Sequence, residues 1–92
     1  MITAKLKNTI ETCAKAFDVR TIWLFGSAVQ DESQAHDIDL AVEGLPPDKF
    51  FEFYTRLFFE LPKPVDLVDL SQETPIASIV REKGIRIYER AK

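Results

Sequence analysis

The sequence predicts a single α/β (α+β) domain in which helices pack against a β-sheet. Amphipathic stretches with helical spacing alternate along the chain with short apolar runs rich in β-branched and aromatic residues. Glycine and proline residues separate many of these stretches. The length of 92 residues suits one domain with a modest core, and we expect residues 1–92 to form it.

The first elements of the chain are predicted to be a helix, a strand and a second, short helix. Apolar side chains at helical spacing predict a helix over residues 3–17, with Thr3 as its cap. Residues 20–25 form an apolar run of β-forming residues, which suits a strand that is buried on both faces. Gly26 ends this strand, and we expect the short helix to begin at Ser27.

A strand with two different faces is predicted over residues 37–43. Its apolar and polar side chains alternate, so that one face is apolar and the other carries carboxylates. The Gly- and Pro-containing segment 44–47 ends this strand. We expect Asp48 to cap a helix over residues 49–60.

The remaining elements are predicted to be a strand, a helix and a final strand. Residues 65–70 form the first of these strands, and residues 85–88 form the last one. Between them, Pro75 marks the first turn of a helix that Gly84 ends. The buried face of this helix is expected to consist of Ile76, Ile79 and Val80.

Charge and composition argue against several classes of protein. The net charge is −3, with 12 basic against 15 acidic side chains, so direct nucleic-acid binding is not expected. No stretch reaches the roughly 18 apolar residues of a membrane helix, and no membrane association is expected. The single cysteine, Cys13, cannot form an internal disulfide, which indicates a reducing, cytoplasmic location.

Two short motifs lie close together in the first half of the chain. Gly26 and Ser27 directly follow a strand, where backbone N–H groups of a turn can face an anion such as a phosphate. Asp37 and Asp39 are two residues apart on a strand and therefore share a face. They are either two solvated side chains or two ligands of one cation, and Mg²⁺ prefers oxygen ligands. Together the motifs predict a site for metal-dependent phosphoryl transfer.

A third carboxylate would complete this site, and two candidates follow later in the chain. Asp66 and Asp69 are three residues apart, so they point to opposite faces of a strand and only one can join the pair. Asp69 lies at the strand end near Ser71, where turn formation explains it. We therefore favour Asp66, which would bind a second metal or accept the proton of an attacking hydroxyl.

These motifs resemble the minimal nucleotidyltransferases (MNT) of the DNA-polymerase-β-like nucleotidyltransferase superfamily. The resemblance covers nearly the whole chain and extends to residues 79–89. It implies a mixed β-sheet flanked by helices. The segments that carry it are Leu24-Phe25-Gly26-Ser27, Asp37-Ile38-Asp39-Leu40 and Val65-Asp66-Leu67-Val68.

The resemblance also implies an activity and a partner. The expected enzyme uses Mg²⁺ to transfer AMP from ATP to a hydroxyl of another protein, with release of pyrophosphate. Asp37, Asp39 and Asp66 would be its catalytic and metal-binding residues, and Gly26 and Ser27 would contact the β- and γ-phosphates. Minimal members of the family often pair with a helical HEPN-domain protein in toxin–antitoxin modules of the MntA–HepT type. There the nucleotidyltransferase is the antitoxin, and the implied acceptor is a tyrosine of the partner.

The placement of basic residues around these motifs departs from the family pattern. There is no Lys or Arg from Thr21 to Asp48, although a nucleoside triphosphate brings several negative charges. Cations from elsewhere would have to fold back toward the site, and the candidates are Arg20, Lys49, Arg81 and Lys83.

Two alternatives to the protein-modifying enzyme therefore stay open. One is a catalytically weak or inactive module of the same fold, which neutralises a HEPN-type partner by contact alone. The other is a nucleotidyltransferase for small molecules, although such enzymes usually carry an additional acceptor-binding domain.

The predicted helix over residues 49–60 is unusually aromatic. Five of the seven phenylalanines lie within residues 50–59, and they form an apolar arc that is broader than one sheet face requires. Phe59 falls on the otherwise polar side of this helix. We therefore expect Phe59 to be exposed in the isolated chain, and the surplus apolar surface to contact a second copy or a helical partner.

Overall fold

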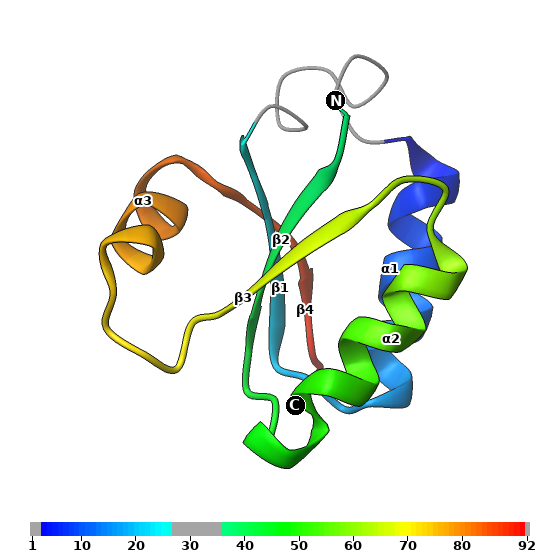
Figure 1. Cartoon of the computed structure of the whole chain (residues 1–92), viewed down its shortest axis with the longest axis horizontal. Helices are drawn as coiled ribbons and strands as arrows, with labels where there is room; N and C mark the ends of the chain where they lie inside the picture. The colour runs from blue at the N-terminus through cyan, green and yellow to red at the C-terminus, as the bar shows by residue number, and fades with distance from the viewer. Residues whose placement is uncertain (1–2, 27–35, 92) are drawn as a thin grey trace.

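The computed structural model describes residues 3–26 and 36–91, and a mixed sheet forms the centre of this part (Figure 1). Its strands are β1 (Thr21–Phe25), β2 (Ile38–Glu43), β3 (Val65–Asp69) and β4 (Ile85–Glu89). The strand order is β3-β2-β1-β4, in which β1 runs antiparallel to both neighbours and β2 pairs with β3 in parallel. Three helices in the described part pack on this sheet, namely α1 (Ala4–Ala16), α2 (Phe50–Glu60) and α3 (Pro75–Lys83). The predicted fold class is confirmed.

Local signals in the sequence set where α1 and α3 begin. The Oγ1 atom of Thr3 accepts a hydrogen bond from the N–H of Leu6 at 3.2 Å, as predicted for the cap of α1. Thr74 accepts one from the N–H of Ala77 at 3.1 Å, just before Pro75 in the first turn of α3. Each cap satisfies an N–H group that has no partner inside its helix. None of the helices described combines the length and the apolar character needed to cross a membrane.

The other two predicted helix starts are those at Ser27 and Asp48. The short helix predicted to begin at Ser27 lies outside the described residues. Asp48 does not cap α2, because it lies inside a 3-10 turn, η2 (Pro47–Lys49), that leads directly into the helix. Pro46 precedes this turn and Pro47 is its first residue, so the chain enters α2 through turn geometry without a side-chain cap.

The two faces of the sheet carry different layers (Figure 1). α1 and α2 cover one face, and α3 packs on the other. The alternation along β2 follows this division: Ile38, Leu40 and Val42 are buried in the core beneath α1 and α2, whereas Ala41 is buried beneath α3. Asp39 therefore points to the face that α3 shares.

The buried face of α3 differs from the expectation. Val80 is buried as predicted, but Ala77 is its buried neighbour, whereas Ile76 and Ile79 are 48% and 54% exposed. The guanidinium group of Arg81 donates a hydrogen bond to the carbonyl of Leu70 at 3.0 Å, which ties α3 to the segment that follows β3. The helix therefore presents a small alanine to the sheet and leaves the two isoleucines at its flanks.

Only part of the aromatic arc of α2 reaches the core. Phe53 and Leu57 are fully buried between α2 and the sheet. The exposed phenylalanines of this helix are Phe51 at 76%, Phe58 at 52% and Phe59 at 78%. The expected exposure of Phe59 is confirmed, and the aromatic arc is wider than the contact that one small sheet offers.

Candidate active site

Three carboxylates converge at one edge of the sheet face that α3 shares. Asp39 in β2 and Asp66 in β3 are direct neighbours in the parallel ladder, so their side chains point the same way. Asp37 precedes β2 and joins them. One oxygen from each of the three carboxylates lies within 4.8 Å of the other two. The structure thus brings together the three residues that the sequence predicts to form the site.

The two candidates for the third carboxylate have different environments. Asp66 is exposed and belongs to the cluster. The Oδ1 atom of Asp69 instead accepts a hydrogen bond from the N–H of Ser71 at 2.9 Å. Asp69 therefore stabilises the turn that follows β3, as the sequence indicates.

The electrostatics of the cluster are unfavourable to its charges. The pKa of Asp39 is raised from 3.8 to about 6, first by burial, then by the charges of Asp37 and Asp66 and by a hydrogen bond with Asp66. All of these effects disfavour the ionised form of Asp39. A divalent cation between the three carboxylates would reverse this effect, because it would compensate the negative charges that raise the pKa.

Gly26 packs directly against this cluster. Its backbone has φ of +74°, in the left-handed region that favours glycine, and a Cβ atom here would collide with Oδ2 of Asp39. This contact follows from the pairing of Phe25 with Asp39 in the antiparallel ladder, which sequence reasoning did not predict. The signal was present as a glycine directly after a strand. Phosphate binding by Gly26 stays a prediction, and Ser27 lies outside the described residues.

Of the four cations expected to fold back toward the cluster, three make ion pairs elsewhere. Arg20 and Arg81 both pair with Glu43, at 2.8 Å and 3.7 Å, and Lys49 pairs with a glutamate of α2. Glu43 follows Asp39 by four residues along β2, which corresponds to about 13 Å. Lys83 makes no ion pair within residues 3–26 and 36–91, and it stays a candidate.

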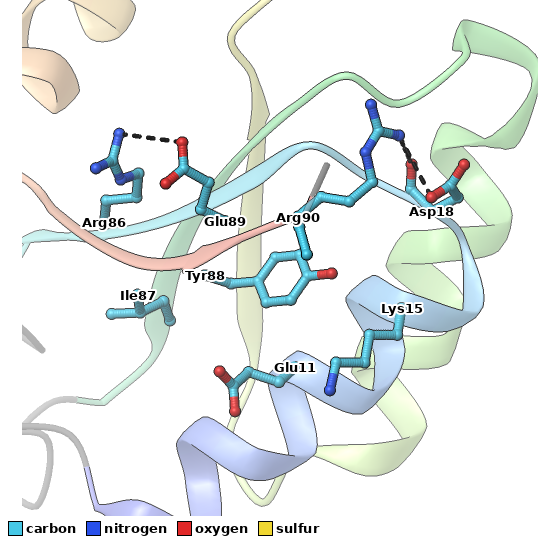
Figure 2. A pocket seen from close by; sticks show the side chains of 9 residues that line it. Glu11, Lys15, Asp18, Arg86, Ile87, Tyr88, Glu89 and Arg90 are labelled. Carbon is cyan, nitrogen blue, oxygen red and sulfur yellow. Dashed lines mark hydrogen bonds and ion pairs between the residues drawn. The ribbon is translucent and has the colours of Figure 1, made fainter.

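A surface hollow of about 620 Å³ lies between α1 and β4, away from the carboxylate cluster (Figure 2). Figure 2 shows the ring of Tyr88 between the strand and the helix, with Glu11 and Lys15 extending from α1. Two arginines at its rim are paired with carboxylates, Arg86 with Glu89 at 3.8 Å and Arg90 with Asp18 at 3.3 Å. Positive and negative side chains are therefore balanced around the hollow, whereas the three clustered aspartates are all negative. We place the candidate site at the carboxylates and not in this hollow.

Comparison with a family model agrees with this geometry. Residues 7–92 match the model described as polymerase beta, nucleotidyltransferase. The match includes both strands that carry the cluster. No curated protein sequence matches the chain significantly.

Several solved structures share the fold. A chain in a toxin–antitoxin complex with AMP-PNP is 26% identical, with a TM-score of 0.74, and the likeness covers 91% of this chain and 73% of that one. A chain in the complex of a tri-AMPylated Shewanella oneidensis HEPN toxin with an MNT antitoxin is 25% identical, with a TM-score of 0.71, over 94% and 71% of the two chains. Another Shewanella oneidensis structure, 21% identical over 97% and 74% with a TM-score of 0.75, shows the common fold alone.

Proposed function

The chain belongs to the polymerase β nucleotidyltransferase family, and from this premise we propose that it transfers AMP from ATP to a tyrosine hydroxyl of a partner protein. The observation that carries the proposal is the convergence of Asp37, Asp39 and Asp66 beside Gly26. The partner would be a HEPN-domain toxin, as in the similar complex that contains an AMPylated toxin, and this chain would be its antitoxin.

The carboxylate cluster fits Mg²⁺. Three carboxylate oxygens lie within 4.8 Å of one another, and hard oxygen ligands are what this ion requires. Asp37, Asp39 and Asp66 would hold it. When bound, it would compensate the charge of the triphosphate and of the leaving pyrophosphate.

The residues of the chain then act mainly by position. Gly26 lets the end of β1 approach the carboxylates closely, and its backbone, with that of Ser27, would face the β- and γ-phosphates. The tyrosine oxygen attacks the α-phosphorus, a new P–O bond forms, and the bond between the α-phosphorus and the bridging oxygen to the β-phosphate breaks. Asp66 is the exposed member of the cluster, so an acceptor can reach it, and we assign to it the proton of the tyrosine hydroxyl.

Label transfer tests the proposal. The protein and its co-purified partner are incubated with α-labelled ATP and Mg²⁺, and the label is followed on both chains. We expect the partner to be labelled, and we expect Asp37→Asn/Asp39→Asn to abolish the labelling. Asp69→Asn is the matched control, because this aspartate lies on the same strand as Asp66 but outside the cluster. Loss of labelling in the control as well would contradict the assignment of the site.

Contact-only neutralisation is the second candidate function. It is favoured by the pairing of Arg20 and Arg81 with Glu43, because these ion pairs leave both arginines away from the phosphates. The same double variant separates the two functions. If Asp37→Asn/Asp39→Asn still binds and still neutralises the partner, the protein acts by contact, and if it binds without neutralising, the protein acts by adenylyl transfer.

A further inference from the structure

Three phenylalanines form an uncovered ridge on α2, which we call the aromatic ridge: Phe51, Phe58 and Phe59. The rings of Phe58 and Phe59 pack edge to face, with their centroids 5.5 Å apart. Phe51 lies about two turns before this pair, and all three rings are on the side of the helix that faces away from the buried Phe53 and Leu57. Isolated exposed phenylalanines need no explanation, but a packed group on one helix is typical of an interface.

We propose that the aromatic ridge is a homodimer interface, in which α2 packs antiparallel against α2 of a second copy about a two-fold axis beside Thr55. Thr55 lies at the middle of the exposed side, between Phe51 one turn before it and Phe58 and Phe59 one turn after it. Its hydroxyl donates a hydrogen bond to the carbonyl of Phe51 at 2.9 Å. The hydroxyl therefore needs no partner across the interface, and the small side chain lets the two helices approach closely.

The two-fold axis brings the aromatic side chains into contact. A residue that precedes Thr55 by a given number of positions faces the residue that follows Thr55 by the same number in the other copy. Phe51 of one copy therefore faces Phe59 of the other and lies beside Phe58. Each half of the interface is a cluster of three rings, and the two clusters flank the central threonines.

In the same arrangement, the charges beside the aromatic ridge of one copy complement those of the other copy. They alternate along the helix as Lys49, Glu52, Arg56 and Glu60, with ion pairs of 3.7 Å between the first two and 3.4 Å between the last two. The axis at Thr55 brings Lys49 to within one residue of the level of Glu60 of the other copy, and Arg56 to within two residues of the level of Glu52 of the other copy. A parallel two-fold arrangement would place the charged sides of the two helices on opposite flanks of the contact, where they could not pair. The pattern thus favours the antiparallel packing and sets its register.

The area suits a reversible dimer. From their exposed fractions, the three phenylalanines offer roughly 400 Å² per copy, taking about 200 Å² for a fully exposed ring side chain. A standard interface buries about 800 Å² per partner, and the flanking polar side chains supply part of the difference. We expect a dissociation constant in the micromolar range.

The position of the ridge keeps the candidate active site accessible. α2 lies on the opposite side of the sheet from α3 (Figure 1). The alternation along β2 directs Asp39, and with it the carboxylate cluster, to the face that α3 shares. A dimer formed through α2 therefore carries two outward-facing carboxylate clusters. This interface does not depend on the proposed function.

Sedimentation velocity of the full chain tests the inference, over about 1 to 200 μM. We expect a monomer–dimer equilibrium whose dissociation constant rises at least about tenfold in Phe59→Ser. Ile79→Ser is the matched control, because Ile79 is also an exposed apolar residue on a helix but lies on α3. A chain that stays monomeric over this range overturns the inference, and so does a dimer that only the control variant weakens.

Charge reversal tests the register without removing apolar surface. Glu52→Arg and Arg56→Glu should each weaken the dimer several-fold, because each places like charges across the two-fold axis. An equimolar mixture of the two variants should regain the wild-type association, because opposite charges meet again in the mixed dimer. If the mixture fails to associate, the antiparallel register is wrong. If variants of the aromatic ridge lose binding to a different protein but keep their self-association, the homodimer is wrong.

Discussion

Replacing Asp39 by asparagine should stabilise the metal-free protein while it abolishes cation binding. The side chain keeps nearly its shape but loses its charge, and Asp39 is the carboxylate whose pKa is raised to about 6. The variant therefore removes the charge that the cluster tolerates least. Opposite effects on stability and on metal binding are the signature of a site built for a cation.

The size of the effect follows from the spacing of the carboxylates. Asp39 has two charged neighbours, with oxygens within 4.8 Å, and each repulsion amounts to about 0.9 kcal/mol at the dielectric constant of water. Salt and solvent screen these partly exposed groups, so we expect a net gain of about 1 kcal/mol. For a domain of this size that corresponds to an increase in Tm of about 4–8 °C.

The gain should depend on pH. The folded-state pKa of Asp39, about 6, lies above the ordinary value of 3.8, so the folded protein binds more protons than the unfolded chain between these values. The wild type therefore loses stability as the pH rises through this window. The advantage of Asp39→Asn should be near zero below pH 4 and largest above pH 6.

Thermal unfolding by circular dichroism measures both effects, at pH 4 and pH 8, with EDTA or with Mg²⁺. Magnesium should raise the Tm of the wild type and of Asp69→Asn at pH 8 but leave that of Asp39→Asn unchanged. Equal Tm values of wild type and Asp39→Asn at pH 8 in EDTA would refute the reasoning about repulsion. An equal response of both proteins to Mg²⁺ would refute the shared cation site.

Three further predictions concern the carboxylate cluster and the ion-paired Glu43. Gly26→Ala should lower the free energy of unfolding by about 1–2 kcal/mol in urea titrations, because the new methyl group meets Asp39 and the backbone is left-handed; an unchanged midpoint would contradict the contact. The affinity for Mg²⁺, measured by calorimetry, should fall as the pH drops below about 6, because protons compete for Asp39; a constant affinity down to pH 5 would exclude Asp39 as a ligand. Burial alone would raise the pKa of Glu43, but hydrogen bonds from Thr21 and Arg20 lower this pKa below 4.5. The ionised Glu43 therefore stabilises the fold above pH 4.5, and this stabilisation is lost at lower pH. Glu43→Gln should therefore cost about 1 kcal/mol at pH 7 and little at pH 3, and an equal cost at both values would contradict this account.

Features that depend on local backbone geometry could be predicted from the sequence. The two-residue period of a strand separates Asp39 from the buried Leu40 and places Asp66 and Asp69 on opposite faces. A hydroxyl before a helical stretch predicts the cap at Thr3. These inferences need only the periods and the hydrogen-bonding groups of the chain itself.

The rotation of each helix about its own axis, and the contacts that long side chains make, depend on the tertiary structure. Ala77, and not Ile76 or Ile79, is buried with Val80, because the sheet face beneath α3 already carries Trp23 and Phe25 and leaves room for a small residue. No local period specifies such a rotation when apolar residues occupy several sides of a helix.

The site itself required both levels. Strand periodicity alone places Asp37 and Asp39 on one face, because side-chain direction alternates along the backbone. Only the tertiary structure placed Asp66 beside Asp39 and Gly26 against its carboxylate, because these contacts depend on the pairing of strands that are distant in the chain. The physical reason is that strand order and register are set by the packing of the whole core, which no single segment encodes.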